Sequence, residues 1–177
     1  ADPALAAELK GIPYVPVAVA AFGWEASSLP RPLDGFGFLV PRLEGRNILG
    51  ALWDSSVFPG RAPKGRALIR VMVGGARQPS LALMPESDLL SMVESELTAT
   101  MGIRTAPILR KVFVHRQAIP QYPVGHGARL DRISARLKDL PGLSLNSNAY
   151  RGIGLNDCAL QSRLCAEELV RRPSQGG

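Results

Sequence analysis

Residues 35–53 read GFGFLVPRLEGRNILGALW, and this stretch decides the fold. Two short apolar runs, residues 35–40 and 47–53, lie on either side of Glu44-Gly45-Arg46, which can form a turn. Short apolar runs separated by turn residues are typical of neighbouring strands in an antiparallel hairpin. We therefore expect these two runs to pair with each other.

The sequence on both sides of this hairpin predicts two further strands. Residues 12–24 are rich in Val and Ala, and their two prolines indicate a strand beginning or an edge position. Residues 66–73 predict a fourth strand that ends at Gly74-Gly75, after a Pro- and Gly-containing loop over residues 59–65. Residues 4–10 read as the tail of a helix already under way, so the start of the sequence looks like a cut.

The second half of the sequence is mostly helical. Leu89, Val93, Leu97 and Met101 repeat every four positions, which predicts an amphipathic helix with Gly102 as its stop. Strands followed by helices are typical of an α+β fold, here a mainly antiparallel sheet with flanking helices. Further along we expect a short strand at 108–114 and then a helix that contains Leu130, Ile133, Leu137 and Leu140 and ends at Pro141-Gly142. A brief strand at 143–145 should follow. The last predicted element is a helix over 157–170, with Asn156 or Asp157 as its N-cap.

Composition excludes several classes of protein. The chain is 46% hydrophobic and 20% charged, which is enough apolar content for a folded core. It contains no apolar run of about 18 residues and no signal-peptide pattern. Cys158 and Cys165 lie seven residues apart in a predicted helix, too far for a disulfide, so we expect reduced, buried thiols and a cytosolic compartment. The two histidines predict no metal site.

The net charge of +6 raises the question of an anionic partner. Arginines are scattered and are not interleaved with stacking aromatics, which argues against a nucleic-acid partner. Solvated surface charge is the simplest interpretation. Attraction for a carboxylate-bearing small molecule or an anionic membrane surface is the main alternative.

One segment carries a signal for ligand binding. Residues 148–158 place a glycine-rich, mostly uncharged turn directly before a helix, where backbone N–H groups lack partners and the helix dipole is positive. Such a turn can bind an anion or a polarised oxygen, and it can equally be a plain connection from strand to helix. The sequence contains no Gly-x-Gly-x-x-Gly, P-loop or Gly-x-Ser-x-Gly motif.

Five stretches of this chain, taken together and in order, resemble signatures of the oxygen-dependent protoporphyrinogen oxidases, within the flavin amine oxidase superfamily. The resemblance covers only the C-terminal half of that family's chain. The stretches are residues 35–41 (GFGFLVP), 49–63 (LGALWDSSVFPGRAP), 72–77 (MVGGAR), 118–126 (AIPQYPVGH) and 152–158 (GIGLNDC).

The resemblance implies an oxidoreductase of haem biosynthesis that converts protoporphyrinogen IX to protoporphyrin IX with FAD and O2. It implies that residues 1–111 form part of a substrate domain, that residues 112–172 return to the FAD-binding α/β domain as a strand-loop-helix, and that residues 173–177 are a flexible tail. The glycine-rich fingerprint would lie in a missing N-terminal half. The resemblance also allows a homodimer and a peripheral association of the full-length, cytoplasmic protein with the inner membrane.

Two sets of site residues follow from the resemblance. Leu39, Leu52 and Met72 match positions that line the porphyrinogen pocket, the alternative being that they are ordinary residues of the sheet core. No residue of the chain matches a catalytic base. The FAD-contacting positions match Asn148, Ile153, Gly154, Leu155, Asn156 and His115, although His115 can equally be a solvent-facing strand residue.

Three functions follow as hypotheses. The first is a C-terminal fragment of an FAD-dependent protoporphyrinogen oxidase, which by itself is not competent and binds FAD weakly or not at all because its site is split. The second is a non-catalytic module for tetrapyrrole binding or dimerisation. The third is a related flavin amine oxidase, against which residues 35–41 and 118–122 argue.

Overall fold

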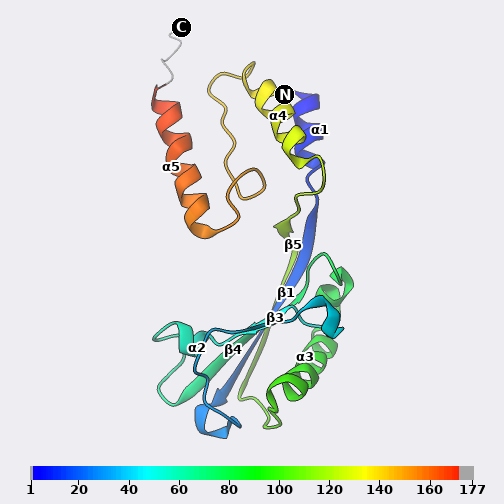
Figure 1. The fold of residues 1–177 in the computed structure, drawn as a ribbon, viewed down its shortest axis with the longest axis vertical. Helices are drawn as coiled ribbons and strands as arrows, with labels where there is room; N and C mark the ends of the chain where they lie inside the picture. The colour runs from blue at the N-terminus through cyan, green and yellow to red at the C-terminus, as the bar shows by residue number, and fades with distance from the viewer. Residues whose placement is uncertain (1, 172–177) are drawn as a thin grey trace. The chain divides into compact units, whose positions relative to one another are not determined.

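The computed structural model describes residues 2–171, which divide into two compact units (Figure 1). Val15–Ile119 form the sheet unit, and residues 2–14 together with 120–171 form the helical unit. The resemblance implied a border after residue 111 and another after residue 172, and the second lies outside the described residues. The described chain divides after Tyr14 and after Ile119. The first helix therefore belongs with the C-terminal elements and not with the sheet.

A five-stranded antiparallel sheet is the framework of the sheet unit. The strand order is β2(Gly37–Leu39)-β3(Gly50–Leu52)-β4(Arg66–Gly74)-β1(Tyr14–Glu25)-β5(Leu109–Pro120). Strands β2 and β3 form the predicted hairpin, in which Gly37 pairs with Leu52 and Leu39 with Gly50. The N–H of Ile108 donates to Gly23 (2.8 Å) and that of Gln121 to Pro13 (2.8 Å), so β5 is antiparallel to β1. The predicted α+β fold is confirmed.

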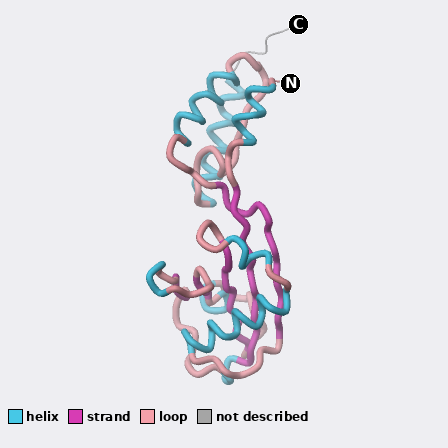
Figure 2. Tube along the Cα trace, turned by 90° about the vertical axis from the view of Figure 1, so that its right-hand side faces the viewer, coloured by secondary structure: helices cyan, strands magenta, loops and turns pink. Residues whose placement is uncertain are grey.

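Helix α3, Glu86–Met101, covers one face of this sheet with the four residues that the sequence spacing identified. Phe22 and Trp24 of β1 and Ile69 and Val71 of β4 point to this face and are at most 1% exposed. Figure 2 looks onto this face, where α3 crosses the strands. The helix ends as predicted at Gly102, whose φ of 71° is left-handed and suits glycine.

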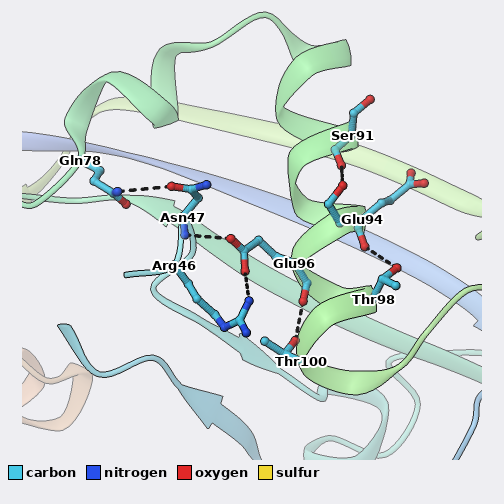
Figure 3. Close-up of polar contacts among 9 residues, drawn as sticks. Arg46, Asn47, Gln78, Ser91, Glu94, Glu96, Thr98 and Thr100 are labelled. Carbon is cyan, nitrogen blue, oxygen red and sulfur yellow. Dashed lines mark hydrogen bonds and ion pairs between the residues drawn. The ribbon is translucent and has the colours of Figure 1, made fainter. Parts of the chain in front are cut away.

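A buried carboxylate ties α3 to the segment before β3. Glu96 accepts hydrogen bonds from the backbone N–H of Asn47 (3.0 Å) and from Nη1 of Arg46 (3.1 Å), as Figure 3 shows. Gln78 donates to the Asn47 side chain at 3.4 Å. Glu96 is only 8% exposed. Burying an unpaired carboxylate would be costly, and these two hydrogen bonds offset that cost.

Two glycines let the hairpin strands approach closely. Gly37 has a φ of 118°, and a Cβ there would lie 1.9 Å from the carbonyl oxygen of Ala51. A Cβ at Gly50 would lie 2.4 Å from the carbonyl oxygen of Phe38. Both positions therefore require glycine for steric reasons. The shorter elements of the sheet unit are η1(Ala26–Ser28), η2(Arg42–Glu44), α2(Asp54–Val57) and η3(Pro79–Leu83).

The helical unit contains both terminal segments of the described chain. Helix α1, Pro3–Lys10, packs beside α4, His126–Leu137, through Leu5 and Ile133 (Figure 1). Glu8 accepts hydrogen bonds from Arg132 at 2.5 and 3.0 Å, and these bonds hold the pKa of Glu8 below its ordinary value. Helix α5, Leu155–Arg171, buries none of its side chains.

Several predicted boundaries were wrong. The Asp2 side chain caps α1 by accepting from Ala4 and Leu5, so this helix begins here and is not the tail of an earlier one. Strand β5 extends to Pro120 because β1 supplies a long pairing edge. Residues 143–145 form no strand, since they have no ladder partner in the described chain.

The last two helices also differ from expectation at their ends. Helix α4 ends at Leu137, so Leu140 follows it in a turn. Helix α5 begins at Leu155, which places Asn156 and Asp157 inside its first turn and not at the N-cap. Cys158 and Cys165 are free thiols, but they are half-buried and not fully buried as expected, because α5 has little covering it.

Within residues 2–171, no helix is both long and apolar enough to span a membrane. The same residues contain no group of three or more His, Cys, Asp or Glu side chains arranged to hold a metal ion.

Candidate functional site

The sheet unit has a second face that α3 does not cover. In an antiparallel sheet, paired residues share a face and alternate residues along a strand return to it. Leu39 pairs with Gly50 and Gly50 with Met72, and Leu52 lies two residues beyond Gly50. Leu39, Leu52 and Met72 therefore share one face. We use the name open face for the part of this face that is formed by Val19, Ala21, Leu39, Leu52, Leu68, Arg70 and Met72.

The open face is apolar and accessible. Leu39 is 83% exposed, and Leu52 and Met72 are half-buried. None of the three belongs to the buried core around α3, which lies on the other side of the sheet. The side-chain alternation of the strands points these three residues away from that core, and their assignment to a porphyrinogen pocket stays a prediction.

One charged residue lies among these apolar side chains. Arg70 pairs across the strands with Leu52 on one side and Ala21 on the other. Its Nε and Nη2 both donate to the carboxylate of Asp54, the second at 2.6 Å. Asp54 is 3% exposed, and its hydrogen bonds raise the pKa of Arg70.

Helix α2 places this carboxylate. The Ser55 hydroxyl accepts the N–H of Leu68 at 3.0 Å, and the Ser56 hydroxyl accepts the N–H of Gly35 at 3.2 Å. The two hydroxyls of the LWDSS sequence thus attach α2 to β4 and to the segment before β2. Asp54 precedes them and is held against Arg70.

Sequence reasoning assigned no role to Arg70 and Asp54. Arg70 was counted only among scattered arginines. Its position two residues before Met72 on a predicted strand was a usable signal, because it places both side chains on one face. Asp54 carried a weaker signal, as the only charged residue in a run of apolar and hydroxyl side chains at 49–58.

The second candidate region is the glycine bend before α5. Ile153 and Leu155 are 77% and 86% exposed, and Asn148, Gly154 and Asn156 are exposed as well. Gly152 has a φ of 79°, and the N–H of Gly154 donates to the Asp157 carboxylate at 3.3 Å. The first-turn amides that follow have no intrahelical acceptor. The bend thus presents main-chain donors on an open surface, which fits an electron-rich planar ligand, although Asp157 occupies one donor.

His115 does not share a unit with the other predicted flavin contacts. It is exposed on β5, in the sheet unit, whereas Asn148, Ile153, Gly154, Leu155 and Asn156 belong to the helical unit.

A buried histidine near the bend was missed. His126 is 8% exposed and stacks on Tyr122, with ring centroids 4.3 Å apart. Neither of its ring nitrogens has a hydrogen-bond partner within the described part of the chain. The Tyr122 hydroxyl donates to the carbonyl of Asn148, and burial raises the pKa of Tyr122. The 118–126 stretch is thereby attached to the bend.

Solved structures define the class of fold. A protein of Exiguobacterium sp. 255-15, assigned as a protoporphyrinogen oxidase, superposes with a TM-score of 0.78 and 25% identity, over 92% of this chain and 36% of that one. A reduced UDP-galactopyranose mutase shares the fold alone, with a TM-score of 0.53 and 14% identity, over 75% of this chain and 28% of the mutase. No protein-family profile matches the chain.

Curated relatives narrow this class. The chloroplastic protoporphyrinogen oxidase of Nicotiana tabacum is 39% identical over 78% of this chain and 26% of its own length. The mitochondrial protoporphyrinogen oxidase of the same plant is 33% identical over 96% of this chain and 34% of its own length. The coproporphyrinogen III oxidase of Bacillus subtilis is 28% identical over 92% of this chain and 35% of its own length.

The predicted resemblance is confirmed. Over most of its own length the chain is similar to the C-terminal part of protoporphyrinogen and coproporphyrinogen oxidases. It spans only about a third of the length of these relatives, between 26% and 35%.

Proposed function

We propose that this chain is the C-terminal part of an FAD-dependent oxidase that converts protoporphyrinogen IX to protoporphyrin IX with O2. In this proposal the open face holds the macrocycle, and the bend before α5 contacts the flavin. FAD supplies the hydride acceptor when it is bound. The predicted cytoplasmic location, homodimer and peripheral membrane association stay predictions from the resemblance.

The main support for this proposal is that three predicted pocket residues lie on one face of the sheet. Leu39, Leu52 and Met72 come from three strands and were selected only by their match to the family. Strand pairing puts them on the same side of the sheet, away from α3. An apolar, accessible surface suits a large macrocycle, because burying apolar area is favourable and needs no directional bond.

The bend supports the flavin part of the proposal. Exposed amides at the start of α5 would stabilise negative charge on a reduced isoalloxazine ring, and the uncharged side chains of Ile153 and Leu155 leave room beside them. Among residues 2–171, the buried ring of His126 has no hydrogen-bond partner, so its two nitrogens would be open to a polar group of a ligand. The protein's contribution to the reaction would be to orient the macrocycle.

Titration of the purified chain with a porphyrin, followed by fluorescence quenching, tests the open face. Leu39→Ala should weaken binding about tenfold, since losing most of a buried leucine side chain costs about 1.5 kcal/mol or more. Leu43→Ala is the matched control, because Leu43 is 99% exposed in η2 and lies outside the open face. Equal losses for both variants, or no saturable binding at all, would reject the open face as the macrocycle surface.

The split flavin site has its own test. The purified chain should show little flavin absorption in its visible spectrum after incubation with FAD, because a site assembled from separated parts lacks preorganised contacts. Stoichiometric flavin absorption would contradict the split site.

A further inference from the structure

We propose that Arg70, held by the buried carboxylate of Asp54, binds a peripheral carboxylate of the tetrapyrrole and so contributes to substrate specificity. This inference rests on the proposed function, because it takes the open face as the macrocycle surface. It assigns a cationic contact within this chain, where the family match supplied only apolar positions.

The geometry of the ion pair leaves the outer edge of the guanidinium available. Asp54 accepts from Nε and Nη2, which occupies one edge of the planar group. In the described part of the chain, Asp54 is the acceptor for Arg70, and neither the N–H bonds of Nη1 nor the second N–H of Nη2 has one. That edge has the spacing for a second bidentate carboxylate contact. The Arg70 side chain is 42% exposed, so a ligand can reach it.

Burial of Asp54 makes this arrangement rigid. The Asp54 side chain is 5% exposed, and the Ser55 and Ser56 hydrogen bonds attach the helix that carries it. An arginine with one edge anchored loses less side-chain entropy when it binds an anion than a free surface arginine does. The pair therefore acts as a preorganised donor and not as a loose surface ion pair.

The position on the face selects the ligand group. Arg70 lies next to Leu52 across the strands and two residues from Met72 on its own strand. A ring lying on Leu52 and Met72 would place its edge near the guanidinium. Porphyrinogens bear carboxylates on short flexible arms at the ring edge, and an apolar macrocycle with anionic arms matches an apolar surface with one fixed cation.

A pair of porphyrins that differ only in charge separates this contact from the apolar one. Coproporphyrin III carries four carboxylates, and its tetramethyl ester keeps the same ring and arms without charge. Fluorescence titrations of the 177-residue chain should give tighter binding of the acid than of the ester. Arg70→Gln should weaken binding of the acid about tenfold, which is the order expected for the loss of a hydrogen bond to a charged group. The same substitution should change the affinity for the ester by no more than about twofold.

Arg66→Gln is the matched control. Arg66 lies on the same strand and the same side of it, its side chain is 40% exposed, and it pairs with the exposed Glu25. It is four residues from Arg70, about 13 Å along the strand. Its substitution should leave the difference between acid and ester unchanged.

Arg70→Gln leaves the Asp54 carboxylate buried without a partner, and this can unfold the protein. A second variant keeps the test valid in that case. The double variant Asp54→Asn with Arg70→Gln removes both charges at similar volume, and it should fold and bind acid and ester alike. Equal weakening by Arg66→Gln, or a persisting acid preference in the double variant, would overturn the role of Arg70 while the apolar surface stands. If the unaltered chain binds neither porphyrin, the proposed function fails and this inference fails with it.

Discussion

Asp54 and Glu96 are the two carboxylates buried within the sheet unit, and each is matched by an arginine. Asp54 orients Arg70 on the open face, whereas Glu96 joins α3 to the segment that leads into β3 on the opposite side of the sheet. The same pairing chemistry therefore serves a candidate ligand contact in one case and the packing of the fold in the other.

Replacing Glu96 tests the packing role at the scale of one residue. Glu96→Gln removes the charge that two donors stabilise, so unfolding free energy should fall by about 1–3 kcal/mol, as measured from urea midpoints at constant slope. Glu94→Gln, two positions earlier on α3, is the control, because Glu94 pairs with Arg110 at the surface. A stability loss in Glu94→Gln as large as in Glu96→Gln would contradict the special role of the buried site.

Among the secondary-structure elements, the β2–β3 hairpin has the tightest steric requirement. Its two strands have three residues each, and they approach so closely that side chains at Gly37 and Gly50 would collide with the facing backbone. The hairpin carries Leu39 and Leu52, so its geometry sets the shape of the open face.

Gly37→Ala should disrupt this hairpin. The added Cβ meets the Ala51 carbonyl oxygen and the φ of 118° is strained for alanine, so we expect a loss of about 2 kcal/mol or more in unfolding free energy. Gly45→Ala shares a positive φ of 63° but has no atom within 4 Å of its Cβ, so it should cost less. Equal urea midpoints for the two variants would show that close strand approach does not matter here.

At the scale of the whole molecule, the helical unit is built from two separate segments of the sequence. Residues 2–14 return to pack with residues that follow position 120, and Glu8 and Arg132 connect these distant segments. The sheet unit lies between them in the sequence and has its own core. Both tryptophans, Trp24 and Trp53, belong to the sheet unit, so their fluorescence reports on that unit alone.

Acid should loosen the helical unit before the sheet unit. The hydrogen bond from Arg132 lowers the pKa of Glu8 from its ordinary 4.5 in the folded state only. Its contribution to stability is therefore present above pH 4.5 and is lost as the pH falls through the lower folded value. The backbone hydrogen bond from Leu5 lowers the pKa of Asp2, which acts in the same direction.

Far-UV circular dichroism melts recorded from neutral pH to about pH 3 measure this loss, with tryptophan fluorescence as the report on the sheet unit. Glu8→Gln should lower the helical melting temperature at neutral pH and reduce its further fall in acid. Glu44→Gln, in the exposed η2 turn, should behave like the unaltered chain. An acid response that Glu8→Gln leaves unchanged would assign the effect to other groups.

The sequence by itself determined the local elements and the family resemblance. The hairpin at 35–53 and α3 could be predicted because turn residues and a four-residue spacing act within a few positions of each other. It could not determine that Leu39, Leu52 and Met72 share a face, or that Arg70, which lies two residues from Met72 on a predicted strand, meets Asp54. Strand register decides this, since a shift of one residue turns every side chain to the other face, and register depends on pairing between strands that are distant in the chain. The absence of a strand at 143–145 has the same cause, because a strand exists only where a partner completes its hydrogen bonds.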